Sequence, residues 1–275
     1  MNEIDLDIYT KICEMVYKYS GIRFDERKVD FVFCRLDERI ECTGAAGLKD
    51  YYQTLRFDFA GLEIHKLVEI LTTNETYFFR EYPQLQSFAE FVLPEVLALK
   101  RKKNDRWINI WSAGCSTGEE PYTLAIILRE MIEDFSSWKI SIIATDINQT
   151  VLKTAKRGIY KSRSVKDVPT EYLNKYFESR EDGFHLSPVI KNMVNFQEVN
   201  LVDSAAISKL SGQNFIFCRN VIIYFDENVN KTLLEKFYDI LDPGGYIFLG
   251  HSESVGRITS AFKLLHQGNM LVYQK

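Results

Sequence analysis

The sequence predicts an α/β fold, a doubly wound sheet preceded by an all-helical N-terminal domain. Before residue 72, apolar residues recur at helical spacing with no strand pattern among them. From Trp107 onward, short apolar runs alternate with helical segments, which is the order typical of a parallel sheet covered by helices. Residues 107–121 combine a strand, a turn of small residues and a helix, the unit that holds nucleotide-like ligands beyond the carboxyl ends of parallel strands.

Composition and charge exclude several classes of protein. The net charge of −4 gives no support for non-specific nucleic-acid binding. No run of 18 apolar residues predicts a membrane span, and the acidic N-terminus lacks the features of a signal peptide. The five cysteines are scattered without a Cys-x-x-Cys pair, which indicates free thiols in a reducing compartment and argues against a zinc site. We therefore expect a cytoplasmic protein without a metal.

The N-terminal part is expected to be a small helical domain. Helices are predicted at about residues 8–19, 25–42, 48–57 and 62–71, with Gly21 and Gly44 as stops after the first two. A further helix at 84–103 ends in a run of basic residues. We expect a helical domain at 1–83, a linking helix at 84–106 and the α/β domain at 107–275.

A basic stripe is predicted on the second helix. Lys28, Arg35 and Arg39 follow one another at i, i+7 and i+11, which places them within about 20° of one line along a helix. Such a stripe could dock an acidic partner helix. The alternative is a solvated face whose charges pair with neighbouring carboxylates.

The α/β domain is expected to contain six strands. They are predicted at 108–111, 140–144, 194–199, 215–218, 246–249 and 270–273. Helices are predicted between them at 121–133, 149–157, near 171–177 and at 227–241. Residues 181–184 are typical of a hairpin turn, so we expect a small β insertion at about 178–197, with an irregular loop as the alternative.

The turn after the first of these strands suggests a ligand. Gly114 is expected to approach the ligand, and Glu119 and Glu120 stand where a phosphate-binding loop would have Lys-Ser or Lys-Thr. Two carboxylates repel phosphate and attract a cation. S-adenosylmethionine is a nucleoside that carries a sulfonium and an ammonium and no phosphate. The alternative is that both glutamates only stabilise the helix N-terminus.

Polar residues after two other strands point to the same edge of the sheet. Asp146 follows the second strand, where an acidic residue accepts hydrogen bonds from ribose hydroxyls; the alternative is a cap for the next helix. Arg219, Asn220 and Tyr224 follow the strand at 215–218 and are expected on the ligand side, although Tyr224 could instead be a core residue. Residues 250–253 begin like a hydrolase motif but lack its second glycine, so we discount that interpretation.

Five motifs together resemble a known family. They are Thr-Thr-Asn-Glu-Thr-Tyr-Phe-Phe-Arg-Glu at 72–81, Trp-Ser-Ala-Gly-Cys-Ser-Thr-Gly-Glu-Glu-Pro-Tyr at 111–122, Ala-Thr-Asp-Ile at 144–147, Phe-Cys-Arg-Asn-Val-Ile-Ile-Tyr-Phe-Asp at 217–226 and Gly-His-Ser-Glu at 250–253. Their residues and order are similar to those of the chemotaxis receptor methyltransferases, the CheR family. The resemblance covers nearly the whole chain.

The resemblance implies a fold and an activity. The fold is a class I S-adenosylmethionine-dependent methyltransferase domain with a small β subdomain, joined to a helical N-terminal domain. The activity is that of a protein-glutamate O-methyltransferase, which modifies glutamate side chains on the cytoplasmic helices of chemoreceptors and releases S-adenosylhomocysteine. The expected partners are chemoreceptor cytoplasmic domains, with no nucleic acid and no membrane insertion, and the enzyme is expected to be a monomer.

The resemblance also implies roles for individual residues. Arg80 and Tyr224 match positions that handle the acceptor glutamate. Docking of an acidic receptor helix would use Lys28, Arg35 and Arg39. The positions that match the family's cofactor pocket are Asn74, Thr76, Arg80, Glu120, Asp146, Asn200, Leu201, Arg219 and Asn220.

The β insertion departs from the family pattern because it is short. Family members with a longer insertion bind a tethering pentapeptide at receptor C-termini, so we expect this protein to work without such a tether. Two other functions stay open. One is methylation of a different acceptor, and the other is a non-catalytic signalling module that binds S-adenosylmethionine as a sensor ligand.

Overall fold

The computed structural model describes residues 3–253, 261–268 and 270–275, which form two compact units. The helical unit comprises Met1–Thr73 and Ile223–Asn230, and the sheet unit comprises Asn74–Ile222 and Lys231–Lys275. The first boundary between the units therefore lies after Thr73, ten residues before the expected end of the helical domain at residue 83. The expected linking helix at 84–106 lies wholly within the sheet unit, because its buried side chains pack on the sheet.

The helical unit has the four helices that the apolar spacing predicts. Each buries one stripe of apolar residues, and together these stripes form the core of the unit, with Ile12, Leu36, Tyr51 and Leu67 almost fully buried. The helices are α1 (Glu3–Ser20), η1 (Glu26–Lys28) leading into α2 (Val29–Thr43), α3 (Leu48–Arg56) and α4 (Leu62–Leu71).

A segment from late in the chain completes the helical unit. Ile22 forms an isolated antiparallel bridge with Phe225. Beside this bridge, the amide of Arg23 donates a hydrogen bond to the carbonyl of Tyr224 at 3.0 Å. The hydroxyl of Tyr17 donates to the carboxylate of Asp226 at 2.7 Å. Residues 223–230 are thus held by backbone and side-chain contacts with the first helix and the loop that follows it.

The sheet unit contains one large sheet with the strand order β6-β2-β1-β7-β8-β10-β9. The strands β6, β2, β1, β7 and β8 are parallel to one another, and β10 is antiparallel to both β8 and β9. The strands are β1 (Trp107–Ala113), β2 (Lys139–Asp146), β6 (Val194–Glu198), β7 (Gln213–Cys218), β8 (Leu241–Leu249), β9 (Lys263–Gln267) and β10 (Met270–Gln274). The six predicted strands are confirmed, and β9 is an additional edge strand.

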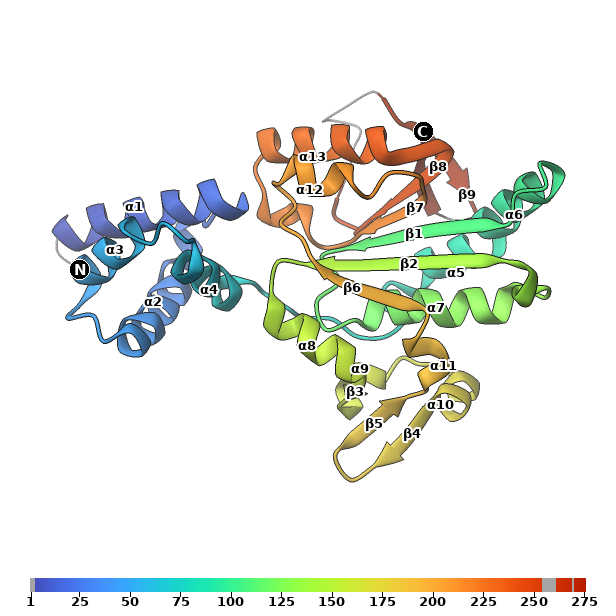
Figure 1. The fold of residues 1–275 in the computed structure, drawn as a ribbon, viewed down its shortest axis with the longest axis horizontal. Coiled ribbons are helices and arrows are strands. Elements are labelled where there is room, and N and C mark those ends of the chain that lie inside the picture. The colour runs from blue at the N-terminus through green and yellow to red at the C-terminus, as the bar shows by residue number, and fades with distance from the viewer. Residues whose placement is uncertain (1–2, 254–260, 269) are drawn as a thin grey trace. The chain divides into compact units, whose positions relative to one another are not determined.

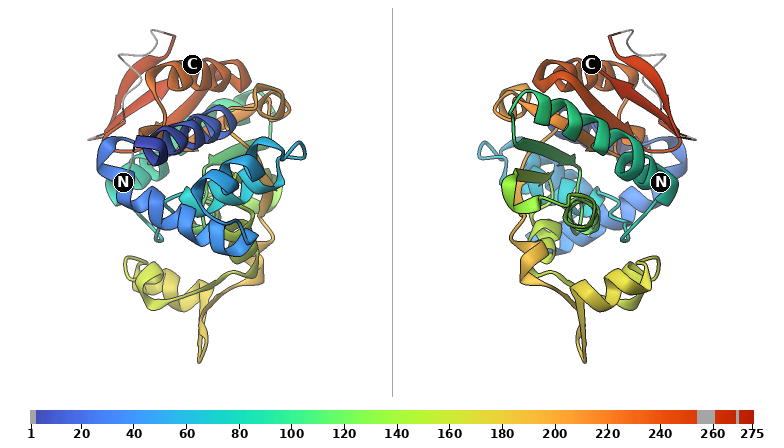
Figure 2. Two further views of the ribbon diagram at one scale, coloured as in Figure 1. Left: turned by 90° about the vertical axis from the view of Figure 1, so that its left-hand side faces the viewer. Right: turned by 90° about the vertical axis from the view of Figure 1, so that its right-hand side faces the viewer.

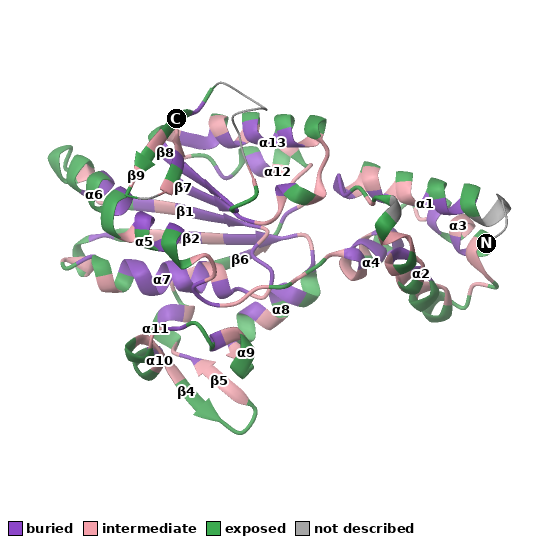
Figure 3. Cartoon of the chain, turned by 180° about the vertical axis from the view of Figure 1, so that it is seen from behind, coloured by how far each residue is buried: buried purple, intermediate pink, exposed green. Residues whose placement is uncertain are grey.

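Helices cover both faces of this sheet (Figure 1). On one face, Phe88 packs edge-on against Phe215 and Phe217, and on the other Trp111 packs against Phe237 of the last helix. The strands between are the most continuously buried part of the unit (Figure 3). The principal helices are α5 (Tyr82–Ser87), η2 (Phe88–Val92), α6 (Leu93–Lys102), α7 (Glu119–Met131), α8 (Gln149–Arg157), α10 (Thr170–Tyr176) and α13 (Glu227–Ile240), with short turns at η3 (Phe135–Ser137), α9 (Ser162–Val165), α11 (Pro188–Lys191), α12 (Ser204–Ser208) and η4 (Ile222–Tyr224).

The helix predicted at 84–103 and the expectation about membrane spans can both be compared with the structure. The helix predicted at 84–103 is one helical stretch from α5 to α6 that contains a π-helical turn at η2. In the part of the chain that the structure describes, no helix is both long enough and apolar enough to cross a bilayer.

The predicted hairpin forms, within a small second sheet of order β3-β5-β4. Strand β3 (Ile159–Tyr160) pairs with β5 (Gly183–Leu186), and β4 (Phe177–Arg180) pairs antiparallel with β5 so that Arg180 faces Gly183. Two residues therefore make the turn. The hairpin is shorter than the expected insertion at 178–197, because β6 already belongs to the large sheet, and it projects from the rest of the sheet unit (Figure 2).

Candidate functional site

The loop between β1 and α7 requires glycine at two places. Gly114 has a φ of +73°, and a Cβ there would lie 2.5 Å from the side chain of Val221. Gly118 has a φ of +93°, and a Cβ there would lie 2.9 Å from Ala155. The amide of Gly114 also donates to the carbonyl of Thr145 at the end of β2. The loop is therefore pressed against the ends of the neighbouring strands, and no larger residue fits either position.

Asp146 fixes this loop to β2. Its buried carboxylate accepts the amide of Ser116 at 2.8 Å and that of Asn148 at 3.0 Å. Burial raises the pKa of Asp146, and these amides oppose the shift. The cap of α8 is Asn148, whose side chain accepts two amides of the first turn, so the alternative role of Asp146 as the helix cap is wrong. Each carboxylate oxygen keeps a further lone pair for a ligand hydroxyl.

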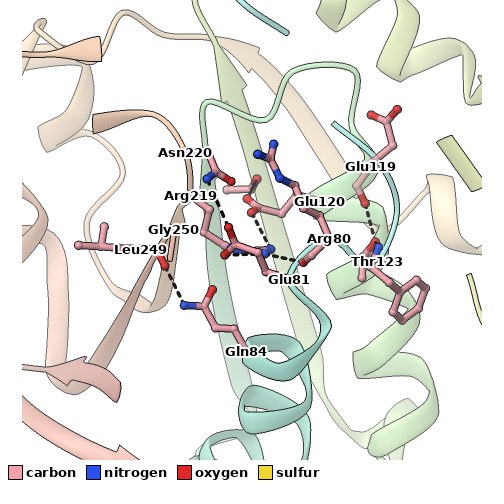
Figure 4. Close-up of polar contacts among 12 residues, drawn as sticks. Arg80, Glu81, Gln84, Glu119, Glu120, Thr123, Arg219, Asn220, Leu249 and Gly250 are labelled. Carbon is pink, nitrogen blue, oxygen red and sulfur yellow. Dashed lines mark hydrogen bonds and ion pairs between the residues drawn. The ribbon is translucent and has the colours of Figure 1, made fainter. Parts of the chain in front are cut away.

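The two adjacent glutamates of α7 face different surroundings, as Figure 4 shows. Glu120 accepts the hydroxyl of Ser112 at 2.7 Å and lies 3.3 Å from a guanidinium nitrogen of Arg219. Burial raises the pKa of Glu120, although the charge of Arg219 opposes this. Glu119 instead accepts the hydroxyl of Thr117 at 2.6 Å. Of the two carboxylates, only that of Glu120 joins the polar cluster around Arg219.

Arg219 is the centre of that cluster, and its side chain is only 3% exposed. Its guanidinium donates to the carbonyl of Arg80 and forms ion pairs with Glu81 and Glu120, each at 3.3 Å (Figure 4). Glu81 also accepts the side-chain amide of Asn220 at 3.3 Å. Burial disfavours the charged form of Glu81, but Arg219 and these hydrogen bonds outweigh it and lower the pKa. Sequence reasoning missed Glu81.

Backbone strain is concentrated at the same place. Phe79, Glu81, Ser116 and Asn220 have φ values between 49° and 59°, the left-handed region that residues other than glycine seldom adopt. Each such residue costs on the order of 1 to 3 kcal/mol and persists only where its surroundings hold it. Residues of this kind gather at ligand sites. The strain therefore supports the loops after β1 and β7, with residues 79–81, as the functional site.

The segment before α5 contributes further predicted residues. The carbonyl of Asn74 accepts the hydroxyl of Ser116 at 3.2 Å, which joins the start of the segment 74–80 to the loop after β1. Thr76 lies in the same non-helical stretch and is half-buried. The half-buried side chain of Arg80 donates to the carbonyl of Glu75 at 2.8 Å and lies over the ring of Tyr77, with 5.8 Å between the guanidinium carbon and the ring centroid.

Asn200 and Leu201 follow β6, next to the end of β2. The amide of Val199 donates to the carbonyl of Asp146 at 3.1 Å, which aligns the two strand ends. The side chain of Asn200 accepts the amide of Val202 at 3.2 Å and so shapes the turn. The structure thus brings every cofactor-pocket residue predicted for the sheet unit to the loops at one edge of the sheet or to residues 74–80 beside them.

Two buried polar atoms at this site lack a protein partner. They are Nε of Arg219 and Oδ1 of Asn220, one a donor and the other an acceptor. Buried groups of this kind are normally satisfied, so they fit a polar ligand. The nearby carboxylates of Glu81, Glu120 and Asp146 outnumber the single buried guanidinium, which favours a cationic ligand over a phosphate. These residues fit the amino-acid part and ribose of S-adenosylmethionine.

The other predicted residues lie in the helical unit. Tyr224 is half-buried, and the ammonium of Lys28 lies 5.0 Å from the centroid of its ring. Arg39 forms a two-pronged ion pair with Glu63 at 2.8 and 2.9 Å and is only 15% exposed. Arg35 pairs with a neighbouring glutamate on α2, and Lys28 precedes that helix, in η1. The three cations therefore do not form one free basic stripe, because the guanidinium of Arg39 is committed to Glu63 and Lys28 lies outside the helix.

Comparisons with known proteins identify the family of the chain. Residues 7–72 match the family model "CheR methyltransferase, all-alpha domain", and residues 74–270 match "CheR methyltransferase, SAM binding domain". Chemotaxis protein methyltransferase 2 of Vibrio cholerae is 43% identical over 266 residues, covering 95% of this chain and 91% of that protein. The chemotaxis protein methyltransferase of Borreliella burgdorferi is 34% identical over 255 residues, covering 92% and 89%. The chain therefore belongs to the CheR family of S-adenosylmethionine-dependent chemotaxis methyltransferases.

Proposed function

We propose that this enzyme is a protein-glutamate O-methyltransferase that modifies glutamate side chains on the cytoplasmic helices of chemoreceptors. The observation that carries the proposal is the match of both family domains, which together span residues 7–72 and 74–270. The names of the relatives place them in chemotaxis. The carboxylates of Glu81, Glu120 and Asp146 support a cationic methyl donor in the sheet unit.

The pocket residues divide between the parts of S-adenosylmethionine. Asp146 would accept from the ribose hydroxyls, and Glu120 would hold the ammonium of the amino-acid part. Arg219 and Asn220 would line the same part through their unpartnered atoms. The remaining proposed pocket residues are Gly114, which lets the loop approach, Asn200 and Leu201 on the adenine side, and Asn74, Thr76 and Arg80 on the segment before α5.

The reaction needs no general base. S-adenosylmethionine supplies an electrophilic methyl group on a sulfonium. A glutamate carboxylate has a pKa of about 4.3 and is already ionised at neutral pH. The protein therefore has to align the acceptor oxygen with the methyl carbon and remove water from the anion, and alignment of this kind is worth up to roughly 7 to 11 kcal/mol. Arg80 would attract the acceptor carboxylate, and the hydroxyl of Tyr224 would orient it.

Receptor docking is proposed for the helical unit. Lys28 lies beside Tyr224, and Arg35 lies on α2, so these two remain docking candidates. Arg39 has its guanidinium committed to Glu63 and is no longer proposed for docking. The enzyme would find its substrate helix without a C-terminal pentapeptide, since the β4–β5 hairpin pairs over only four residues on each strand.

The decisive experiment follows label from methyl-labelled S-adenosylmethionine into isolated chemoreceptor cytoplasmic fragments, with and without the C-terminal pentapeptide. Label that mild alkali releases as methanol identifies a carboxyl methyl ester and supports the proposal. Label that survives alkali identifies a different acceptor atom. An absence of transfer, with cofactor binding demonstrated separately, favours a different acceptor or a sensor. Equal rates with both fragments support action without the tether.

The role of Arg80 is tested by its alanine variant. If Arg80 holds the acceptor, R80A lowers turnover at saturating cofactor by far more than it lowers cofactor affinity. A large loss of cofactor affinity with normal turnover at saturation contradicts the assignment.

A further inference from the structure

The motif Gly250-His251-Ser252-Glu253 follows β8 and has no part in the proposed mechanism. Its glutamate bridges two loops. One carboxylate oxygen of Glu253, Oε2, accepts the amide of Gly250 at 2.6 Å and the amide of Asn220 at 2.9 Å. The amide of Glu253 in turn donates to the carbonyl of Gly250 at 2.9 Å. The loop after β8 is therefore closed on itself and joined to the loop after β7.

The residue that Glu253 holds is a strained one. Asn220 has a φ of +59°, and a residue other than glycine needs compensating contacts to stay in this region. A hydrogen bond to a carboxylate is roughly twice as strong as one between neutral groups. Glu253 supplies such a bond to the backbone of Asn220, and Glu81 supplies another to its side-chain amide. Two carboxylates thus fix Asn220 and leave its Oδ1 without a protein partner.

Gly250 allows this approach. A Cβ at position 250 would lie 2.7 Å from Oε2 of Glu253 and 2.8 Å from the amide nitrogen of Asn220. Both distances are shorter than a side chain tolerates, so a larger residue would push the carboxylate and the amide apart. Glu253 therefore makes the contact with the amide of Asn220, and Gly250 leaves the room that this contact needs.

We propose that Glu253 is a positioning residue for cofactor binding. It holds the backbone of Asn220 in the left-handed conformation, which directs the free side-chain oxygen of Asn220 to the amino-acid part of S-adenosylmethionine. This inference rests on the proposed placement of the cofactor against Asn220. It assigns a role to the Gly-His-Ser-Glu motif that requires no hydrolytic chemistry.

The test is the dissociation constant of S-adenosylhomocysteine, measured by calorimetry on the full-length protein. The variants are N220A, E253A, E253Q, G250A and the double variant N220A/E253A, with E133A as a control because Glu133 is an exposed glutamate. We expect E253A and G250A each to weaken binding about tenfold, the factor that one hydrogen bond to a charged group is worth. E253Q keeps an acceptor oxygen and should fall between E253A and the wild type. E133A should bind as the wild type does.

The double variant separates positioning from a general loss of structure. If Glu253 acts through Asn220, E253A adds nothing to the loss already caused by N220A. Additive losses overturn the inference. Wild-type affinity in E253A with weak binding in N220A also overturns it but leaves the cofactor placement intact. Wild-type affinity in N220A refutes the placement itself. Thermal melting identifies any variant that fails to fold. If E253A is such a variant, the binding constants of E253Q and G250A replace it in the test.

Discussion

The substitution E120Q is expected to have opposite effects on cofactor binding and on folding. Glu120 is only 15% exposed, accepts the hydroxyl of Ser112 and forms an ion pair with Arg219. Glutamine has nearly the same shape and keeps an oxygen for Ser112, so the variant removes the charge and little else. Arg219 retains Glu81 and the carbonyl of Arg80 as partners.

Cofactor affinity should fall strongly. The bound ammonium loses a charged hydrogen-bond partner, and such a bond contributes about 1.5 to 3 kcal/mol. At about 1.4 kcal/mol for each factor of ten, the dissociation constants of S-adenosylmethionine and S-adenosylhomocysteine should rise roughly 10- to 150-fold. Methylthioadenosine, which lacks the amino-acid part, should bind E120Q and the wild type equally.

Folding should change little or improve. The pKa of Glu120 is raised above its usual value of 4.5, so its ionised form costs stability once the pH exceeds the unfolded pKa. Glutamine removes this cost and loses one partially buried ion pair, but Arg219 keeps Glu81 and the carbonyl of Arg80 as partners, so its charge is not left unpaired. We expect the free energy of unfolding to stay within about 1 kcal/mol of the wild type.

The matched control is E119Q. Glu119 is the neighbouring residue, is buried and also has a raised pKa, but its carboxylate accepts the hydroxyl of Thr117. Calorimetric titration should show less than about a twofold change for E119Q, since no charged bond to the ligand is lost. Equal losses in E119Q and E120Q, or a loss for methylthioadenosine as large as for S-adenosylmethionine, would refute the assignment of Glu120 to the ammonium.

Three further predictions concern other parts of the structure. G114A should bind S-adenosylhomocysteine at least about tenfold more weakly, because the new Cβ meets Val221 at 2.5 Å and the φ is positive; unchanged calorimetric binding contradicts the loop geometry. R39A should destabilise the protein by about 3 to 5 kcal/mol, because it leaves the buried charge of Glu63 without its cationic partner, although the hydroxyl of Tyr51 still donates to it; denaturant unfolding measures this, and a loss below about 1 kcal/mol means that the pair contributes little. Affinity for S-adenosylmethionine should fall as the pH decreases through the raised pKa of Glu120, since protonation removes its charge, and titrations across that range should show a shallower dependence in E120Q.

Most of the fold was predictable because the spacing of apolar residues indicates where helices and buried strands form. Six strands of the large sheet appear as short apolar runs, and the burial of β1 and β7 explains why those runs are nearly continuous. The strand β9 was missed because it lies at the edge of the sheet and its residues are mostly exposed. The π-helical turn at η2 has no signature in a sequence read for a period of 3.6 residues.

The site was predictable in part. Gly114 and Asp146 stand at positions that follow from the strand-turn-helix pattern, and the structure places them where the pattern requires. Glu81 and Glu253 were missed because their role is to hold Arg219 and the amide of Asn220. These contacts join residues that are far apart in the sequence, and spacing along the chain carries no signal for them.

The basic stripe shows where periodicity alone misleads. The spacing of Lys28, Arg35 and Arg39 assumes one unbroken helix with all three residues on a solvated face. The structure begins α2 at Val29, and Arg39 is drawn inward because Glu63 offers a carboxylate among apolar side chains. A single sequence does not show which charge on a helix has such a buried partner.

The contribution of Ile223–Asn230 to the helical unit affects how the protein is made and dissected. The chain passes between the two units after Thr73, after Ile222 and after Asn230. During synthesis the four N-terminal helices emerge first, but their unit is incomplete until residue 230 of 275 has left the ribosome. A protein cut after Thr73 would leave Tyr224 without the backbone contact to Arg23. The helical unit therefore cannot be removed as residues 1–73 alone. Tyr224, the residue proposed to orient the acceptor, belongs to this unit and depends on its N-terminal part for that contact.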